Sequence, residues 1–222
     1  MRVNKYLAQA TGLSRRAADI AIQNGRVTVN QRRAVLGDNI DSKDSVQLDG
    51  QSVILNPEHL TIMLHKPLGY VCSRNGQGSR TIYELLPSEY HKLKPVGRLD
   101  KDSSGLLIMT NDGNLANRLA HPRFAKTKVY EVSLTEPLNP ADKTKLDRGI
   151  KVEDYTSYLK LSPISPNKWQ VTLSQGRNRQ IRRTFAVLNY TVKTLHRTAF
   201  GPYKLADLPV GQYKLCDTEY TT

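Results

Sequence analysis

An aspartate stands directly before the most apolar run of this sequence, which is where a carboxylate can meet a ligand at the edge of a core. Residues 106–109 read Leu-Leu-Ile-Met, with Gly105 before them and the turn residues Asn111-Asp112-Gly113 after them. This pattern predicts a short buried strand. Asp100 is therefore expected at the mouth of the core. From spacing alone, an aspartate that caps a turn or pairs with Lys101 explains the pattern equally well.

A tyrosine is the second residue that could carry chemistry. Residues 126–135 alternate in polarity, which predicts a strand with two different faces. The alternation places Tyr130 with the apolar set, beside Lys128, Val132 and Leu134. A tyrosine on such a face is more often part of the core than catalytic, because its ring buries a large area. Both interpretations remain open at this point.

An arginine-rich run, residues 176–185, is the third candidate. A helix through its second half places its apolar side chains on one face, with Arg182 at the flank of that face and Arg179 and Arg183 close to opposite. A flank guanidinium can reach a carboxylate in a half-buried cleft, whereas the other two are free for phosphate. A solvated basic helix face is the alternative.

Composition favours a polyanionic partner. The chain has 222 residues, of which 38% are hydrophobic, so it can bury a core in one large domain or in a large and a small one. Its formal net charge is +13 and its pI is about 9.8. Such a charge favours nucleic acid through counterion release. An anionic membrane surface fits less well, because no strongly amphipathic basic helix with exposed aromatic residues occurs.

Several other classes of protein do not fit the sequence. No run of 18 apolar residues and no apolar N-terminal segment occurs, so we expect a cytoplasmic protein without a membrane span or signal peptide. Cys72 and Cys216 are far apart, which argues against a disulfide framework or a structural zinc site. The glycine-rich residues 74–80 lack the spacing of a P-loop. The five histidines make no ligand spacing, so no metal or organic cofactor is expected.

The first 50 residues predict a small unit of two helices and short strands. Helices are expected over residues 2–10 and 15–24, the second capped by Ser14 and ended by Gly25, and strands over 26–30, near Val35 and over 45–48. Its basic residues lie on the helices, near their ends and at turns, where they can line one face; they are Lys5, Arg15, Arg16, Arg26, Arg32 and Arg33.

A linker is expected over residues 51–60, because the segment lacks periodicity and contains Pro57. A larger unit over residues 61–222 follows. Its expected strands cover residues 61–65, 157–161, 168–173 and parts of 192–215, in addition to the two described above. Its expected helices cover residues 114–120 and 140–149, the latter opened by Asn139-Pro140.

The motifs of the larger unit resemble those of a known enzyme family. Gly97-Arg-Leu-Asp100, followed by Asp102-Ser-Ser-Gly-Leu-Leu107 and Thr110-Asn-Asp-Gly113, closely resembles the catalytic signature of bacterial ribosomal RNA pseudouridine synthases, the family typified by RsuA and RluB. Lys128-x-Tyr130 resembles its second motif, and the arginine run 176–183 resembles its Gly-Arg-Asn-Arg-Gln-x-Arg-Arg motif. Lys66-Pro-Leu-Gly69 is similar to a segment near its active site.

The first 50 residues resemble a second known unit. The order of elements, with Ser14-Arg-Arg opening the second helix and residues 24–30 (Asn-Gly-Arg-Val-Thr-Val-Asn) after it, is similar to the small RNA-binding domain first seen in ribosomal small-subunit protein four. The two resemblances together imply an α+β fold. A small N-terminal alpha-L RNA-binding domain would precede a mixed, mainly antiparallel β-sheet synthase domain with flanking helices.

The resemblance also implies a role for each candidate residue. Asp100 would be the catalytic aspartate, Arg182 would keep it ionised and oriented, and Tyr130 would pack on the target base. Arg98 would enter the space that the flipped base leaves, or hold a phosphate. Ser103-Ser104, where the family commonly has a threonine, and Ser174-Gln175, where a glutamate often precedes the glycine, are small departures that leave only the choice of substrate in doubt.

The expected function is therefore the isomerisation of one uridine in structured ribosomal RNA by a monomeric enzyme that uses no cofactor. A noncatalytic rRNA-binding or ribosome-assembly factor is the alternative, although a carboxylate beside phosphate opposes simple binding. Whether Asp100 attacks the sugar or removes a sugar proton stays open. The residues expected to bind RNA are Arg98, Arg177, Arg179, Arg183, Lys128, Arg15, Arg16 and Arg26.

Overall fold

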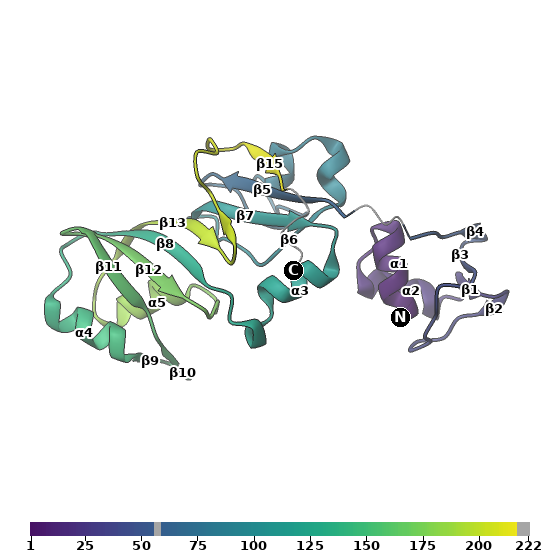
Figure 1. Ribbon diagram of the computed structural model, residues 1–222, viewed down its shortest axis with the longest axis horizontal. Helices are drawn as coiled ribbons and strands as arrows, with labels where there is room; N and C mark the ends of the chain where they lie inside the picture. Colours follow the sequence, from purple (N-terminus) through teal and green to yellow (C-terminus); the bar gives the residue numbers. More distant parts are fainter. Residues whose placement is uncertain (56–58, 217–222) are drawn as a thin grey trace. The chain divides into compact units, whose positions relative to one another are not determined.

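Two short helices begin the chain, α1 (Val3–Thr11) and α2 (Arg15–Gln23). They are seen in a computed structural model that describes residues 1–55 and 59–216 (Figure 1). Ser14 caps α2 as expected, since its hydroxyl accepts a hydrogen bond from the amide of Ala17 at 3.0 Å. The apolar faces of α1 and α2 share one small core with the strands that follow them.

These strands form a four-stranded antiparallel sheet in the order β2-β1-β3-β4. The strands are β1 (Val27–Val29), β2 (Arg32–Arg33), β3 (Val46–Leu48) and β4 (Gln51–Ser52). The prediction of a strand near Val35 is wrong in position. The strand in this region is β2, whose pairing ends at Arg33, and the Val35 side chain is exposed.

The linker expected over residues 51–60 also needs correction. Asp49 and Gly50 both have left-handed φ angles, 52° and 76°, and such a pair makes a tight hairpin that turns the chain back from β3 into β4. Residues 51 and 52 therefore belong to the sheet. The first unit extends to His59 and also includes Asn111–Gly113, and the second begins at Leu60, while residues 56–58 of the expected linker lie outside the described residues.

The second unit contains a nine-stranded mixed sheet, in which the path β11-β12-β8-β13-β7-β5-β15 carries two further short strands, β14 on β13 and β6 on β7. The β13–β7 pair is parallel and all the others are antiparallel. The strands are β5 (Thr61–Lys66), β6 (Lys94–Pro95), β7 (Ser104–Thr110), β8 (Lys128–Leu134), β11 (Lys160–Ser165), β12 (Lys168–Leu173), β13 (Val192–Phe200), β14 (Tyr203–Lys204) and β15 (Tyr213–Leu215).

Strand β7 has both faces covered, and this explains its continuous apolar sequence. Leu107 and Met109 belong to the main core on one face, whereas Leu106 and Ile108 belong to a second core on the other. A strand that is buried on both faces has no polar side to alternate with. Gly105 has a φ of 107°, and a Cβ there would lie 2.3 Å from the carbonyl oxygen of Arg197. The absence of a side chain therefore lets β7 and β13 approach closely just after Asp100.

Helices flank the sheet at both ends (Figure 1). The α-helices are α3 (Gly113–Ala120), α4 (Pro140–Arg148) and α5 (Gln180–Val187), and the 3-10 helices are η1 (Ile82–Leu85), η2 (Ser88–Lys92) and η3 (Pro122–Phe124). Asn139 caps α4 as expected, since its side chain accepts a hydrogen bond from Ala141 at 2.8 Å.

One expected strand, residues 157–161, is divided in the structure. Ser157 ends β10 (Tyr155–Ser157), which pairs with β9 (Ile150–Val152) in a separate two-stranded sheet, and Lys160 begins β11. The hydroxyl of Ser157 is buried and bonded to the side chains of Gln180 and Thr184 on α5, at 3.0 and 2.8 Å. These contacts hold the end of β10 against the helix, so the chain cannot run on as one strand.

Candidate active site

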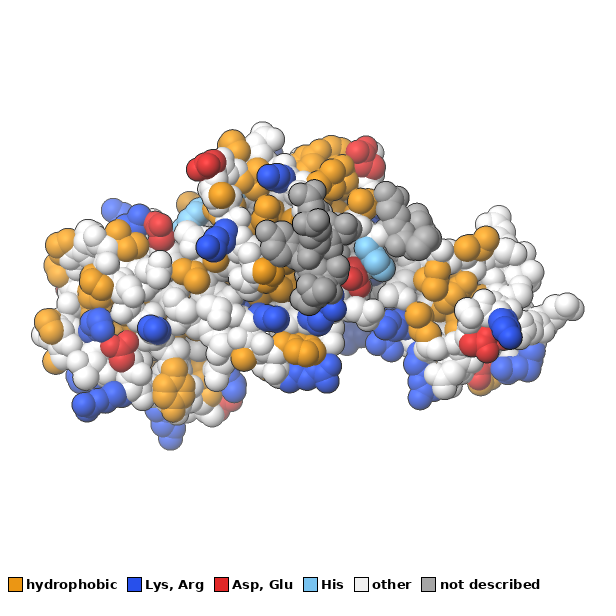
Figure 2. Space-filling model, in the orientation of Figure 1, with side chains coloured by type: hydrophobic (Ala, Val, Ile, Leu, Met, Phe, Trp, Pro, Cys, Tyr) orange, Lys and Arg blue, Asp and Glu red, His pale blue; other side chains and the backbone are white. Residues whose placement is uncertain are grey.

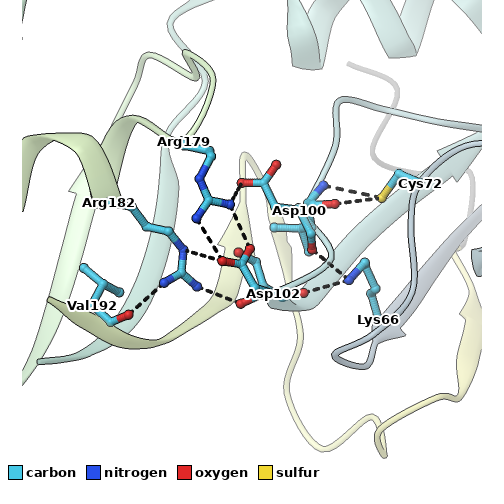
Figure 3. Close-up of polar contacts among 9 residues, drawn as sticks. Lys66, Cys72, Asp100, Asp102, Arg179, Arg182 and Val192 are labelled. Carbon is cyan, nitrogen blue, oxygen red and sulfur yellow. Dashed lines mark hydrogen bonds and ion pairs between the residues drawn. The ribbon is translucent and has the colours of Figure 1, made fainter. Parts of the chain in front are cut away.

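A buried lysine fixes the turn that carries Asp100. The side chain of Lys66, at the end of β5, is fully buried, and its ammonium donates to the carbonyl oxygens of Pro67, Asp100 and Ser103 at 3.0, 3.0 and 2.7 Å. Figure 3 shows Lys66 reaching the turn at Asp100. All three of its hydrogen atoms are thus used. Burial lowers the pKa of Lys66, and the nearby acids partly offset that effect. The lysine therefore acts as a clamp on the main chain on both sides of the aspartate.

A second contact holds the residue before the aspartate. The thiol of Cys72 donates to the Leu99 carbonyl at 3.3 Å and accepts from the Leu99 amide at 3.4 Å (Figure 3). Burial raises the pKa of Cys72, so it remains a neutral thiol. Leu99 is itself buried in the main core. The side chain of Asp100, in contrast, is one third exposed.

This turn forms one wall of a cavity of about 670 Å³. Residues 97–100 lie on that wall, and residues 173–181 form the opposite loop and helix start. Strands β8 and β13 supply the floor, with Lys128 and Tyr130 from the first and Leu195, Arg197 and Phe200 from the second. Tyr130 is on the buried face, as the alternation predicts, and its ring also lines the cavity. A volume of this size suits a nucleoside or another small ligand.

The two acids of the turn pair with the arginines of residues 176–183 differently from the prediction. Arg179 binds Asp102 through two hydrogen bonds of 3.1 and 3.0 Å, and its Nη1 lies 3.7 Å from the Asp100 carboxylate (Figure 3). Arg182, expected beside Asp100, instead has its Nε 3.3 Å from the Asp102 carboxylate. Among the described residues, the ion pair of Asp100 is thus with Arg179, which we expected to be free for phosphate.

The backbone at Arg179 explains this difference. Arg179 has a left-handed φ of 47° and precedes the first residue of α5. Its side chain therefore does not lie on the helical face that the sequence pattern predicts for it. Arg182 lies inside the helix at its flank, as predicted, but behind the cavity wall. Its two terminal nitrogens donate to the carbonyl oxygens of Asp102 and Val192, both at 2.7 Å. Arg182 therefore fixes main chain on two sides.

The electrostatics of this cluster favour the ionised form of Asp102. Burial opposes the ionised form of Asp102, but the hydrogen bond and charge of Arg179 and the charge of Arg182 outweigh it, so the pKa of Asp102 lies below its usual value. Burial lowers the pKa of Arg182, and the charge of Asp102 partly restores it. The two acids and two arginines are thus held as a neutralised group.

The remaining candidates fall at different distances from the cavity. Arg98 and Arg177 are exposed and line it. Arg177 also lies over the Tyr155 ring, 4.3 Å from its centroid. Arg183 is turned away and pairs with Glu153. Arg197 and Lys66 were not predicted as site residues, although the two-residue spacing of Leu195 and Arg197 on one strand face placed an arginine among apolar side chains.

In the first unit the basic candidates are exposed. Arg15 donates only to the side chain of Asn4, at 3.2 Å, and Arg16 has no ion pair or hydrogen bond in the part of the chain that the structure describes. Arg26 forms two bonds with Asp49, at 2.8 and 2.5 Å. Basic side chains are spread over the drawn face of both units and acidic ones are fewer (Figure 2). Arg15 and Arg16 are therefore the freer cations.

Residues 1–55 and 59–216 contain neither a cluster of metal ligands nor a helix that spans a membrane. No group of three His, Cys, Asp or Glu side chains in these ranges is placed to hold a metal ion. Within the same ranges, every helix is too short or too polar to cross a lipid bilayer.

Comparison with known families matches both units. The family described as RNA pseudouridylate synthase matches residues 60–187, and the S4 domain matches residues 1–46. A crystal structure of a pseudouridylate synthase superimposes with a TM-score of 0.73 at 30% identity, covering 99% of this chain and 97% of that one.

Curated relatives agree with these matches. The dual-specificity RNA pseudouridine synthase RluF of Escherichia coli (strain K12) is 34% identical over 99% of this chain and 77% of its own length. The ribosomal small subunit pseudouridine synthase A of the same organism is 34% identical, over 96% of this chain and 95% of its own length. The ribosomal large subunit pseudouridine synthase B of Haemophilus influenzae is 36% identical, over 98% and 65%. The similarity thus spans both units.

Proposed function

The chain belongs to the RNA pseudouridylate synthase family, and from that premise we propose that it isomerises a specific uridine of ribosomal RNA to pseudouridine, with Asp100 as the reacting carboxylate. Relatives that act on ribosomal RNA, the S4 match and the net charge of +13 support this substrate. Ribosomal RNA as substrate puts the enzyme in the cytoplasm. We further propose that the enzyme acts as a monomer.

The observation that carries the proposal is the way Asp100 is held. Lys66 and Cys72 fix the main chain at Leu99, Asp100 and Ser103, while the carboxylate itself stays one third exposed at the cavity wall. A nucleophile or base needs this combination of a fixed backbone and an accessible reacting group. A carboxylate that served only the turn would gain nothing from facing a cavity lined by cations.

The reaction needs the target base inside the cavity. The carbons that change partners are shielded in stacked RNA, so the nucleotide must be flipped out, at a cost of a few kcal/mol that contacts to the backbone offset. Tyr130 packs on the flipped base, since its ring lines the floor of the cavity. Arg98 is exposed beside Asp100 and fills the space that the base leaves, or holds a phosphate.

The arginines act at two depths. Arg179 lies near enough to Asp100 to favour its ionised form, which both routes need, attack at the sugar and removal of a sugar proton. Arg182 works through Asp102 and the main chain, so it is a positioning residue. Arg177 and the exposed arginines of the first unit contact phosphate, and Lys128 contacts the RNA from the floor of the cavity. Arg183 contributes to the same field from outside the cavity.

The experiment is to incubate the full-length protein with ribosomal RNA that lacks modifications and to map pseudouridine at nucleotide resolution. One or a few new pseudouridines are expected. Tight binding with no pseudouridine in free rRNA or in assembly intermediates of either subunit would favour the noncatalytic RNA-binding factor instead. Asp100→Asn is the matched control, because it keeps the shape of the side chain and removes its charge.

A further inference from the structure

Arg197 carries a charge that the fold does not neutralise. It is 2% exposed and lines the floor of the cavity from β13. Its Nε donates to the Leu106 carbonyl at 2.7 Å, whereas its Nη2 is buried and has no hydrogen-bond acceptor in the described residues. Arg197 forms no ion pair with any carboxylate of that part of the chain. A buried cation with an unused hydrogen-bond donor is energetically unfavourable. Its position beside a cavity therefore indicates that a ligand in the cavity accepts the missing hydrogen bond.

A second cation lies beside it. Lys128 Nζ is 5.1 Å from the centroid of the Phe200 ring, and Arg197 Cζ is 5.0 Å from the same centroid. Lys128 also lacks an ion pair within the described residues. Burial and the charge of Arg197 together lower the pKa of Lys128. Two cations thus line the same cavity beside one aromatic ring, and neither has an ion pair among the described residues, which favours an anionic ligand there.

The anion for this corner must lie deep in the cavity and against the base-packing tyrosine. Arg197 Cζ is 6.0 Å from the centroid of the Tyr130 ring. A phosphate carries its charge throughout and is served by exposed cations such as Arg98 and Arg177, which also line the cavity. A buried guanidinium is worth most to a charge that develops during the reaction, because it needs no reorganisation there.

We propose that Arg197, aided by Lys128, binds the detached uracil as an anion through its exocyclic oxygens. This inference rests on the proposed function. When the bond from C1′ to N1 breaks, its electron pair stays with the base, whose negative charge spreads onto O2 and O4. Meanwhile C1′ is bonded to the Asp100 carboxylate or, if Asp100 instead removes the C2′ proton, shares a double bond with C2′. The new bond then joins C1′ to C5 as the ester bond breaks and frees Asp100, or as C2′ regains its proton; the hydrogen of C5 leaves as a proton, and N1 gains a proton. The anion exists only between these two steps, and Arg197 stabilises it and the transition states that flank it.

The test varies the stability of that anion. Transcripts of the rRNA segment found by mapping are made with uridine or with 5-fluorouridine, whose fluorine withdraws charge from the anion. Loss of the starting nucleoside is measured in single-turnover reactions at saturating enzyme. Arg197→Met is expected to slow the reaction of uridine by about 100-fold or more, as loss of one oxyanion donor does. The loss on 5-fluorouridine is expected to be several-fold smaller, because that anion needs less help.

Arg182→Met is the matched control, since Arg182 is also a largely buried arginine but contacts main chain behind the cavity wall. It should slow both substrates by the same factor. Equal losses on both substrates with Arg197→Met would overturn the inference. A weaker affinity for RNA with an unchanged rate at saturation would also overturn it, and would assign Arg197 to a phosphate.

Two further outcomes separate the causes of failure. If Arg197→Met does not fold in a thermal melt, Arg197→Lys is compared instead; it keeps the charge, so a smaller loss that fluorine still reduces supports the inference, and a loss independent of fluorine overturns it. If the unaltered protein makes no pseudouridine in any rRNA, it is the proposed function that fails.

Discussion

The turn that carries Asp100 and the floor of the cavity hold charge in opposite ways. On the turn before β7, Asp100 and Asp102 are matched by Arg179 and Arg182, and each of these arginines has a carboxylate within 4 Å. On β8 and β13, Lys128 and Arg197 form no ion pair with a carboxylate of the described residues. Opposite charges that pair cancel most of each other's electrostatic potential and hold the positions of the groups that carry them. Unpaired cations keep their positive potential and can bind an anionic ligand.

The difference assigns different work to similar residue types. Arg182 and Arg197 are both largely buried and both donate to main-chain carbonyls. The Nε of Arg182 has no hydrogen-bond acceptor but lies 3.3 Å from the Asp102 carboxylate, whereas Arg197 has a buried Nη2 without an acceptor and no carboxylate partner among the described residues. The turn is therefore the part that is held in place, and the floor is the part that meets the charge that develops on the substrate. Each variant below tests one side of this contrast.

Asp100→Asn should have the largest effect. The amide keeps the shape but cannot attack the sugar or accept its proton, so the single-turnover rate should fall by roughly 10⁴-fold or more. Affinity for rRNA should be retained or slightly tightened, because a negative charge near phosphate is removed. Both quantities are measured on one folded sample. Retained isomerisation would remove Asp100 from the chemistry, and joint loss of rate and binding would make it a structural residue of the turn.

Among the changes at the turn, Arg182→Met should come next after Asp100→Asn, and its effect should exceed that of Arg183→Met. The first change leaves the carbonyl oxygens of Asp102 and Val192 without their donor and should cost about 2–3 kcal/mol of unfolding free energy, with a rate loss of about 10–100-fold from a displaced turn. The second removes a pair with an exposed Glu153 and should change stability by less than about 1 kcal/mol. Urea unfolding and single-turnover rates decide between them, and equal losses for the two variants would contradict the positioning role.

The arginines of the first unit should affect binding more than rate. Changing Arg15 and Arg16 to Ala should lower the slope of log affinity against log salt by between about 1 and 2, since each phosphate contact releases roughly one counterion. Arg26→Ala should lower it less, because Asp49 already neutralises that guanidinium. Filter binding over a series of salt concentrations measures both slopes. The same slope for the double variant and the unaltered protein would exclude a phosphate role for α2.

Local rules predicted much of this fold, and contacts between distant residues account for what they missed. The caps at Ser14 and Asn139 and the two faces of residues 126–135 follow from neighbours in sequence, and the structure confirms them. The division of the strand expected over 157–161 depends on α5, more than 20 residues further along the chain. The Asp49-Gly50 hairpin, in contrast, carried a local signal that the linker interpretation overlooked.

The site shows the same limit. Asp100 can be found from its motif, but the contact that fixes it joins Lys66 to a carbonyl 34 residues away. Arg197 reaches a carbonyl 91 residues away, so its burial follows only from the order of strands in the sheet. The prediction paired Asp100 with Arg182, whereas the structure pairs it with Arg179, because Arg179 has a left-handed backbone at the start of the helix. Sequence thus indicates which residues can react, and long-range pairing decides how they are held.

Acidification should have the smallest effect, a small loss of folding stability. It tests directly the ion pairs of Asp102 with Arg179 and Arg182. The pKa of Asp102 is lowered in the folded protein, so its ionised form contributes stability at pH values above its unfolded pKa of about 3.9, and that contribution is lost as the pH falls through the folded value. Because the Asp102 side chain is 47% exposed, solvent screening limits the contribution to about 1 kcal/mol.

Asp102→Asn should accordingly be less stable than the unaltered protein near neutral pH, and the difference should shrink toward zero below about pH 4. Urea unfolding at about pH 7, 5 and 3.5 measures it. Asp154→Asn, a change at an exposed aspartate, is the control and should show little difference at any pH. A difference for Asp102→Asn that persists unchanged in acid would mean that the side chain acts through its shape. The pairing of Asp102 with Arg179 and Arg182 would then not be what fixes the turn.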